Sequence, residues 1–172
     1  MKNSIPKKRD VHNMITNSKL RYLTHASIIA ALYVALTAIF QAISFGALQV
    51  RVSEALCVLP VLSAAAVPGL FIGCLISNIL WSGAILDIIV GSLTTLVAAA
   101  ITYRLRKKPL IAFSAPVILN ALAIAAVLGL LFGVPYGLGV LYVGIGQIIA
   151  CYGLGVPLWI LLRKYKDTLF RI

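Results

Sequence analysis

Long apolar runs, separated by short polar segments, dominate the pattern of this chain. Runs that are long enough to cross a membrane cover residues 25–45, 84–103, 110–132 and 139–162. A helix that crosses a bilayer needs about 20 mostly apolar residues. The pattern therefore predicts four membrane-spanning helices in these runs.

A fifth apolar stretch, residues 52–81, is too long for one comfortable span and short for two. Pro68 and Gly69 interrupt it, and a helix is expected to end at such a pair so that the chain can turn. The sequence predicts two helices here, over residues 53–66 and 70–81. A re-entrant pair of short helices is the alternative.

The positions of the basic residues argue against a single span over residues 52–81 and are compatible with either two helices or the re-entrant pair. All Lys and Arg except Arg51 lie in three packets outside the apolar runs: Lys2, Lys7, Lys8, Arg9, Lys19 and Arg21; Arg104, Arg106, Lys107 and Lys108; Arg163, Lys164, Lys166 and Arg171. Positive packets favour the cytoplasm, so an even number of crossings must separate them. The prediction is an all-α integral membrane protein, a bundle of six transmembrane helices with both termini cytoplasmic.

Composition agrees with a membrane protein. Hydrophobic residues make up 62% of the 172 positions and charged residues 11%, and the mean hydropathy is +1.05. A soluble domain would need more polar surface. The net charge of +11 lies in packets that flank apolar runs, which favours contact with anionic lipid headgroups rather than nucleic acid. We expect a multi-pass membrane protein, with basic tails at 1–24 and 164–172 around a membrane domain at 25–163.

Polar residues inside the apolar region fall mainly in its outer half. Arg51, Glu54 and Asp87 are the only formal charges between Tyr22 and Tyr103. Ionisable groups at membrane depth are functional candidates by default. Together with uncharged polar residues they predict a pocket that is open to the outside and closed toward the cytoplasm, and its candidate members are Arg51, Glu54, Asn78, Asp87, Asn120 and Gln147.

Each of these residues also has a purely structural interpretation. Arg51 and Glu54 can form an ion pair at the membrane interface, which is worth little where it is exposed. Asp87 can interact with the positive end of the helix that it begins. The amides can hydrogen-bond between helices. Their convergence on one half of the membrane favours the pocket.

An enzyme is not favoured by the sequence. No histidine follows His25, no metal-binding motif is present, and the acids are not closely paired. Cys57, Cys74 and Cys151 lack metal-type spacing and are expected in the core. We therefore predict no catalytic residue, no metal site and no cofactor.

Five blocks of sequence resemble the queuosine-precursor transporter (QueT) family. The resemblance covers roughly residues 28–162, and its blocks are QVRVSEALCVLP (49–60), PGLFIGCLISN (68–78), LDIIVGSLTT (86–95), PVILN (116–120) and LYVGIG (141–146). Members of this family are substrate-binding S-components of energy-coupling-factor (ECF) transporters.

The resemblance implies a function and partners. The chain would capture a deazaguanine base, such as the pre-queuosine base or queuine, outside the cell. It would then associate with a membrane coupling subunit and two cytoplasmic ATPases. The small residues of the first helix would face the coupling subunit, with Ala31 and Ala35 favoured over Ala26 and Ala30. The alternatives are an S-component for another nucleobase-like or vitamin substrate, and a stand-alone secondary transporter, for which we see no internal repeats.

The resemblance also suggests roles for the polar residues. Glu54 would accept the guanine-like edge and Asp87 the aminomethyl cation, an assignment that can be reversed. Asn78, Asn120 and Gln147 would meet the ring polar atoms, although the family pattern has Glu at the position of Gln147. Arg51 would orient Glu54 or gate the outer loop. The candidates for stacking are Trp81 and Tyr142.

Overall fold

The structure, a computed structural model, describes residues 8–44 and 50–169, with side chains from residue 18 onward except at 167. Its described residues form helices only, as the sequence predicted. In chain order these are α1 (Lys8–Ile39), α2 (Gln41–Ser44), η1 (Val52–Val61), α3 (Ala66–Trp81), η2 (Asp87–Gly91), α4 (Ser92–Arg104), α5 (Pro109–Ala112), α6 (Ser114–Phe132), α7 (Tyr136–Ile148), η3 (Ile149–Leu154), α8 (Gly155–Arg163) and α9 (Lys166–Leu169).

Four helical segments have the length and apolar character to cross a membrane. They are Ser18–Ile39, Asp87–Arg104, Pro109–Phe132 and Tyr136–Arg163, and they correspond to the four long runs of the sequence. The last segment contains α7, the π-helical turn η3 and α8 without a break. These helices fit a multi-pass membrane protein.

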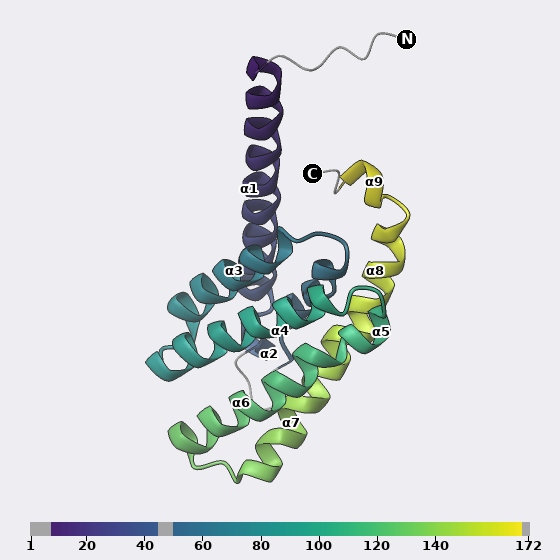
Figure 1. Ribbon diagram of the computed structural model, residues 1–172. Coiled ribbons are helices and arrows are strands. Elements are labelled where there is room, and N and C mark those ends of the chain that lie inside the picture. Colours follow the sequence, from purple (N-terminus) through teal and green to yellow (C-terminus); the bar gives the residue numbers. More distant parts are fainter. Residues whose placement is uncertain (1–7, 45–49, 170–172) are drawn as a thin grey trace.

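The first helix is longer than its apolar run. α1 begins at Lys8, so a large part of the predicted basic tail belongs to the same helix as the first span. Its early turns extend past the rest of the bundle, toward the side on which α9 lies (Figure 1).

The second apolar stretch differs from the prediction. Residues 52–61 form a 3₁₀ helix, η1, rather than the predicted helix over 53–66, and every residue from Ser53 to Val61 is buried. At about 2.0 Å of rise per residue a ten-residue 3₁₀ helix is about 20 Å long, shorter than the roughly 30 Å hydrocarbon core. The protein packs around η1 with α1, α3, α4, α8 and η3.

The chain also turns earlier than Pro68 suggested. α3 begins at Ala66, so Pro68 lies in its first turn, and residues 62–65 link it to η1. The first N–H groups of a helix have no partner within the helix, so proline at this point costs no helical hydrogen bond. Pro68 therefore helps to begin α3, and the prediction that the preceding helix ends there was wrong.

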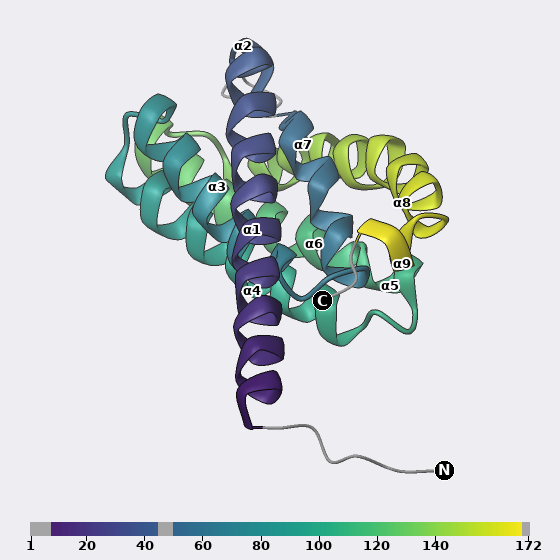
Figure 2. The same cartoon turned by 90° about the horizontal axis from the view of Figure 1, so that it is seen from above.

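The helices cross to form one bundle around η1. α1 packs mainly on α3, α3 on α4, α4 on α6 and α6 on α7. In the view of Figure 2, α1 runs through the middle of the picture, with α3 on its left and α8 on its right. The largest apolar cluster lies between α1, η1, α3 and α8, and includes Tyr33, Leu56, Leu59 and Leu70.

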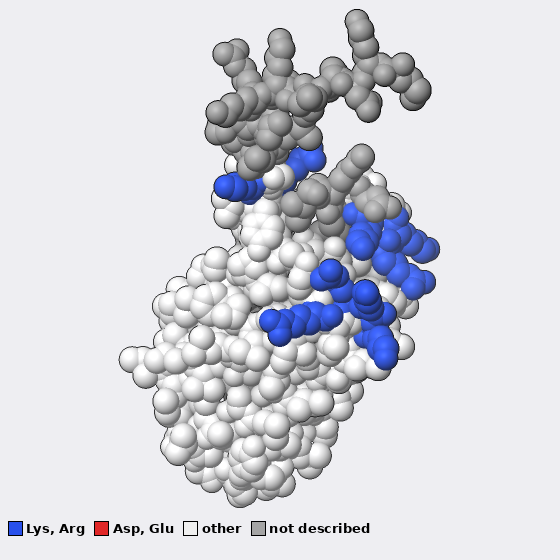
Figure 3. Space-filling model, viewed as in Figure 1, with Lys and Arg blue, Asp and Glu red and all other residues white. Residues whose placement is uncertain are grey.

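Basic residues gather at one side of the molecule. The Lys and Arg side chains in Figure 3 lie near the start of α1, the α4–α5 turn and α8, whereas the region of the α6–α7 turn shows none on this face. At this basic side Arg106 stacks on Tyr103 at 4.3 Å and Arg163 on Trp159 at 4.9 Å. Aromatic and basic side chains of this kind are typical of a membrane interface.

Candidate functional site

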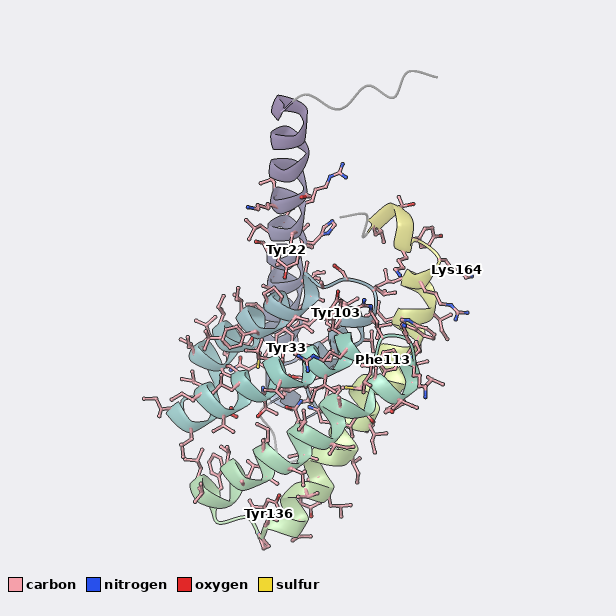
Figure 4. The ribbon with its side chains drawn as sticks, viewed as in Figure 1. Tyr22, Tyr33, Tyr103, Phe113, Tyr136 and Lys164 are labelled. Carbon is pink, nitrogen blue, oxygen red and sulfur yellow. The ribbon has the colours of Figure 1, made fainter. Side chains whose placement is uncertain are left out.

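Glu54 lies in the middle of the bundle and accepts hydrogen bonds from three elements. The Tyr33 hydroxyl of α1 donates to Oε1 at 2.6 Å, and the Cys57 thiol of η1 donates to Oε2 at 2.9 Å. The Asn120 amide of α6 also donates to Oε2, at 3.4 Å. The Glu54 side chain is only 1% exposed. Figure 4 shows Tyr33 at the centre, where α1 crosses α3 and α4.

The geometry of η1 explains why these residues meet. In a 3₁₀ helix, side chains three residues apart lie above one another. Arg51, Glu54 and Cys57 have this spacing, and the Glu54 N–H donates to the Arg51 carbonyl at 3.0 Å. One edge of η1 therefore presents a guanidinium, a carboxylate and a thiol to the neighbouring helices.

Asp87 has a different partner. Arg51 Nη2 lies 3.3 Å from Asp87 Oδ2, and both side chains are less than a tenth exposed, at 7% and 9%. The sequence interpretation paired Arg51 with Glu54, either as an interfacial ion pair or as its orienting neighbour. The structure corrects this, because the guanidinium reaches across the bundle to the first residue of η2.

A second polar cluster surrounds Asp87. The Asn78 amide of α3 donates to the Asp87 carbonyl at 3.1 Å and to Cys74 Sγ at 3.5 Å. Thr95 of α4 donates to the same sulfur at 3.3 Å. η2 is a π-helical turn, a local widening that is frequent at functional sites.

Gly91 allows this cluster to be compact. A Cβ atom at Gly91 would lie 2.9 Å from Asn78 Nδ2 and 3.4 Å from Asp87 Oδ1. Any side chain at this position would therefore displace the amide or the carboxylate. The glycine at the end of η2 places α3 and α4 close enough to share these polar groups.

Gln147 lies on the Glu54 side of the polar interior, to which Cys151 connects it. The Cys151 sulfur of η3 lies 3.7 Å from both Gln147 Oε1 and the Glu54 carbonyl, so its single S–H can donate to either oxygen. Gln147 is 3% exposed. Six of the eight predicted binding residues are thus buried in one polar interior: Arg51, Glu54, Asn78, Asp87, Asn120 and Gln147.

The two proposed stacking residues lie elsewhere. Tyr142 is 37% exposed on the outside of α7. Trp81 ends α3 and is partly exposed. No contact of either ring with the polar interior is found among the described residues, and their positions suit the edge of the bundle.

Five contributors were missed by the sequence analysis: Tyr33, Cys57, Cys74, Thr95 and Cys151. A signal for Tyr33 was present, because Ala26, Ala30, Tyr33 and Thr37 follow one another at helical spacing and share the buried face of α1. Cys57 could have been found from its three-residue spacing to Glu54 only if the 3₁₀ helix had been foreseen. Without knowledge of the 3₁₀ helix, a cysteine in an apolar run is expected to be an ordinary core residue.

The predicted small-residue pairs of α1 differ in exposure, although all four alanines line the same groove between α1 and α3. Ala26 and Ala30 are buried, and they pack on α3, where a Cβ atom at Gly69 would lie 2.7 Å from the Ala26 carbonyl. Ala31 and Ala35 are exposed. They line an apolar groove of about 640 Å³ between α1 and α3, together with Val34, Ile72 and Ile76.

The two acids of the described interior have different kinds of partner. Glu54 is bound by neutral donors, a phenol, a thiol and an amide, whereas Asp87 is bound by a cation. Groups of this kind, held at fixed depth by several helices, can recognise a small polar ligand that carries both neutral donors and a positive charge.

A comparison with protein families identifies the chain. The model of the family described as QueT transporter matches residues 23–164. This chain belongs to the QueT transporter family. QueT proteins form a transporter family, not an enzyme family.

One curated QueT relative also matches. The chain is 44% identical over 82 residues to "Queuosine precursor transporter QueT" of Lactococcus lactis subsp. cremoris (strain MG1363). This alignment covers 46% of the chain and 48% of the relative, so the match spans about half the length of that QueT protein. No solved structure matches the chain.

Proposed function

We propose that this chain is the substrate-binding S-component of an ECF importer and captures a queuosine-precursor base from outside the cell. The observation that carries the proposal is the buried cluster around Glu54 and Asp87 within a member of the QueT transporter family. The printed name of the relative from Lactococcus lactis supports the substrate class.

The partners of the two acids support an assignment of the ligand. A deazaguanine base offers adjacent neutral N–H donors on its guanine-like edge, and the pre-queuosine base adds an aminomethyl cation. Glu54 already accepts from neutral donors and Asp87 from a cation. In our proposal Glu54 accepts the guanine-like edge and Asp87 the ammonium, so that each acid exchanges one partner for another of the same charge.

The remaining polar residues complete the proposed site. Asn120 and Gln147 approach Glu54 from α6 and the α7–η3 junction and would bind the ring carbonyl and nitrogens. Asn78 lies beside Asp87. We keep Trp81 and Tyr142 as stacking candidates only for an arrangement in which the outer ends of α3 and α7 move toward the ligand.

The fold suggests how the chain would sit in the membrane. We propose six crossings, with η1 and α3 as the two short ones, and cytoplasmic N- and C-termini. The gathering of basic residues at one side of the bundle supports this orientation (Figure 3). The polar interior would then be approached from the outer ends of η1, α3 and α4.

The groove between α1 and α3 supports a docking site for the coupling subunit. Ala31 and Ala35 are exposed in it, and small side chains allow a second helix to approach closely. Ala26 and Ala30 already pack on α3 and would support the groove from within. The two ATPases would act through that subunit, and the basic packets would bind anionic lipid headgroups.

Calorimetry with a ligand panel tests the proposal. The purified protein, without ATP, is titrated with the aminomethyl-deazaguanine, its nitrile precursor, queuine and guanine. We expect one site and tightest binding of a deazaguanine. Uptake into liposomes is expected only when the coupling subunit and ATPases are present. Absence of binding to the whole panel, or uptake by this chain alone, would contradict the proposal.

A further inference from the structure

The environment of Asp87 has unused acceptor capacity. Asp87 Oδ1 and Asn78 Oδ1 are buried and have no hydrogen-bond partner among the described residues. A buried acceptor without a donor destabilises the protein, because it has lost its hydrogen bonds to water and gained none in return. Both oxygens belong to the cluster that Arg51 enters, so this cluster can accept more donors than the protein supplies to it.

The contact of Arg51 with Asp87 is a partial one. Arg51 Nη2 approaches one carboxylate oxygen at 3.3 Å, whereas strong ionic hydrogen bonds measure about 2.7–2.9 Å and are often bidentate. Arg51 Nη1 faces Cys74 Sγ at 3.9 Å. The guanidinium thus compensates the buried carboxylate without saturating it.

We propose that Arg51 is an internal stand-in for the cation of the ligand: it occupies Asp87 when the site is empty and is exchanged for the ammonium on binding. This inference rests on the proposed function and extends it to a residue that sets specificity. Arg51 directly precedes η1 on extended backbone, with φ −83° and ψ 99°, so its side chain can turn away while η1 stays in place.

Electrostatics favours an exchange of one cation for another. Removing one partner of a buried ion pair leaves an uncompensated charge in the interior and is strongly unfavourable. A ligand with an ammonium restores the compensation of Asp87, and its N–H groups also reach the two free acceptor oxygens. A neutral ligand cannot displace Arg51 without leaving Asp87 unpaired. The ion pair therefore lowers the affinity for the cationic ligand, which must displace Arg51, and has little effect on a neutral analogue, which leaves Arg51 in place.

The first test compares two ligands in Arg51→Met, which keeps much of the apolar stem and removes the charge. We expect affinity for the aminomethyl base to rise at least tenfold, or about 1.4 kcal/mol, and affinity for the nitrile to change by less than about threefold. Arg21→Met, at an exposed basic position, is the matched control. Equal changes for both ligands, or weaker binding of the aminomethyl base, would overturn the inference.

The second test does not depend on the identity of the transported base. Methylammonium, the smallest analogue of the aminomethyl group, is expected to raise the melting temperature of Arg51→Ala in a concentration-dependent manner. Tetramethylammonium, which has the same charge and no N–H donor, should not. Wild type and Arg51→Ala/Asp87→Asn should not respond to either ion. If Arg51→Ala responds equally to both ions, the inference fails even when the base binds.

A charge-neutral pair of substitutions covers the case in which single variants do not fold. Arg51→Met/Asp87→Asn removes both charges and leaves none uncompensated. It is expected to bind the nitrile about as well as wild type and the aminomethyl base at least tenfold more weakly. Equal loss for the two ligands overturns the stand-in role. If wild type binds neither base, the proposed function fails, whereas the methylammonium response still decides the inference.

Discussion

At the scale of single residues, the account depends on how Glu54 is held. Its carboxylate accepts from a phenol, a thiol and an amide that belong to α1, η1 and α6. The shortest of these contacts, 2.6 Å, comes from Tyr33. Hydrogen bonds to charged groups contribute about 1.5–3 kcal/mol, so Tyr33 is the main anchor of the carboxylate.

Removing the Tyr33 hydroxyl tests this anchor. Tyr33→Phe should lower the free energy of unfolding by about 1–3 kcal/mol, because Glu54 Oε1 loses its donor in a buried site. Denaturation in detergent measures the change, and calorimetry should show weaker binding of the base. Tyr136→Phe is the control, since its hydroxyl makes only an exposed contact of 3.4 Å. Equal effects of the two substitutions would contradict the role of Tyr33.

The sequence identified most of the polar interior because charges and amides are conspicuous in an apolar chain. Arg51, Glu54 and Asp87 could be selected on desolvation cost alone. Their pairing could not, because it depends on which way the side chains point from η1. Tyr33 and Cys74 were missed for a related reason: each is compatible with an apolar core until a neighbouring carboxylate or amide gives it a partner.

At the scale of elements, η1 is the segment in which the structure differs most from the sequence prediction. An α-helix was predicted where the chain forms a buried 3₁₀ helix that ends at Val61. Apolar composition cannot distinguish the two, since every side of η1 contacts protein and no amphipathic periodicity is required. The four long helices were predictable because each contains about 20 mostly apolar residues, the length that a membrane-spanning helix needs.

The contact of α1 with α3 places Tyr33 next to Glu54. A Cβ atom at Gly73 would lie 2.7 Å from Tyr33 Cβ and 3.0 Å from the Ala30 carbonyl. Gly73→Ala should therefore push the helices apart, lower the melting temperature and weaken binding of the base. Gly137→Ala is the matched control, because nothing lies within 4 Å of its Cβ position. If Gly73→Ala retained wild-type stability and affinity, the close contact would not be what positions Tyr33.

At the scale of the whole molecule, substrate capture and coupling are assigned to different surfaces. The polar interior lies among η1, α3, α4 and α6, and the apolar groove lies outside, between α1 and α3. α1 belongs to both, since it carries Tyr33 on its buried face and Ala35 on its exposed face. A substitution in the groove should therefore affect transport without affecting capture.

Ala35→Trp tests this separation. The bulky ring should fill the groove and block the coupling subunit, so that uptake into liposomes that contain the complete transporter falls at least tenfold. Calorimetric affinity for the base should stay within about twofold of wild type. Ile118→Trp, at an exposed position of α6, should leave both quantities unchanged. Normal uptake by Ala35→Trp would exclude this groove as the docking site.

Thiol labelling in intact cells tests the proposed orientation. Cys57, Cys74 and Cys151 are at most 1% exposed, so they should give little background. A membrane-impermeant maleimide should label Tyr136→Cys, at the α6–α7 turn, and should label Lys107→Cys only after the cells are opened. Figure 4 places Tyr136 at the end of the bundle opposite Tyr22 and Lys164. The reverse labelling pattern would contradict cytoplasmic termini.

The most direct measurement of the central claim is calorimetric titration of purified wild type and Glu54→Gln with the aminomethyl-deazaguanine, without ATP. The substitution keeps the size and shape of the side chain. It replaces a carboxylate, in which both oxygens accept hydrogen bonds, with an amide that has one acceptor oxygen and one donor NH2 group. We predict one site in wild type and at least a hundredfold loss, or about 2.7 kcal/mol, in Glu54→Gln, measured on protein that still melts in a single cooperative transition. Binding of equal strength in the two proteins would contradict Glu54 as the acceptor of the base.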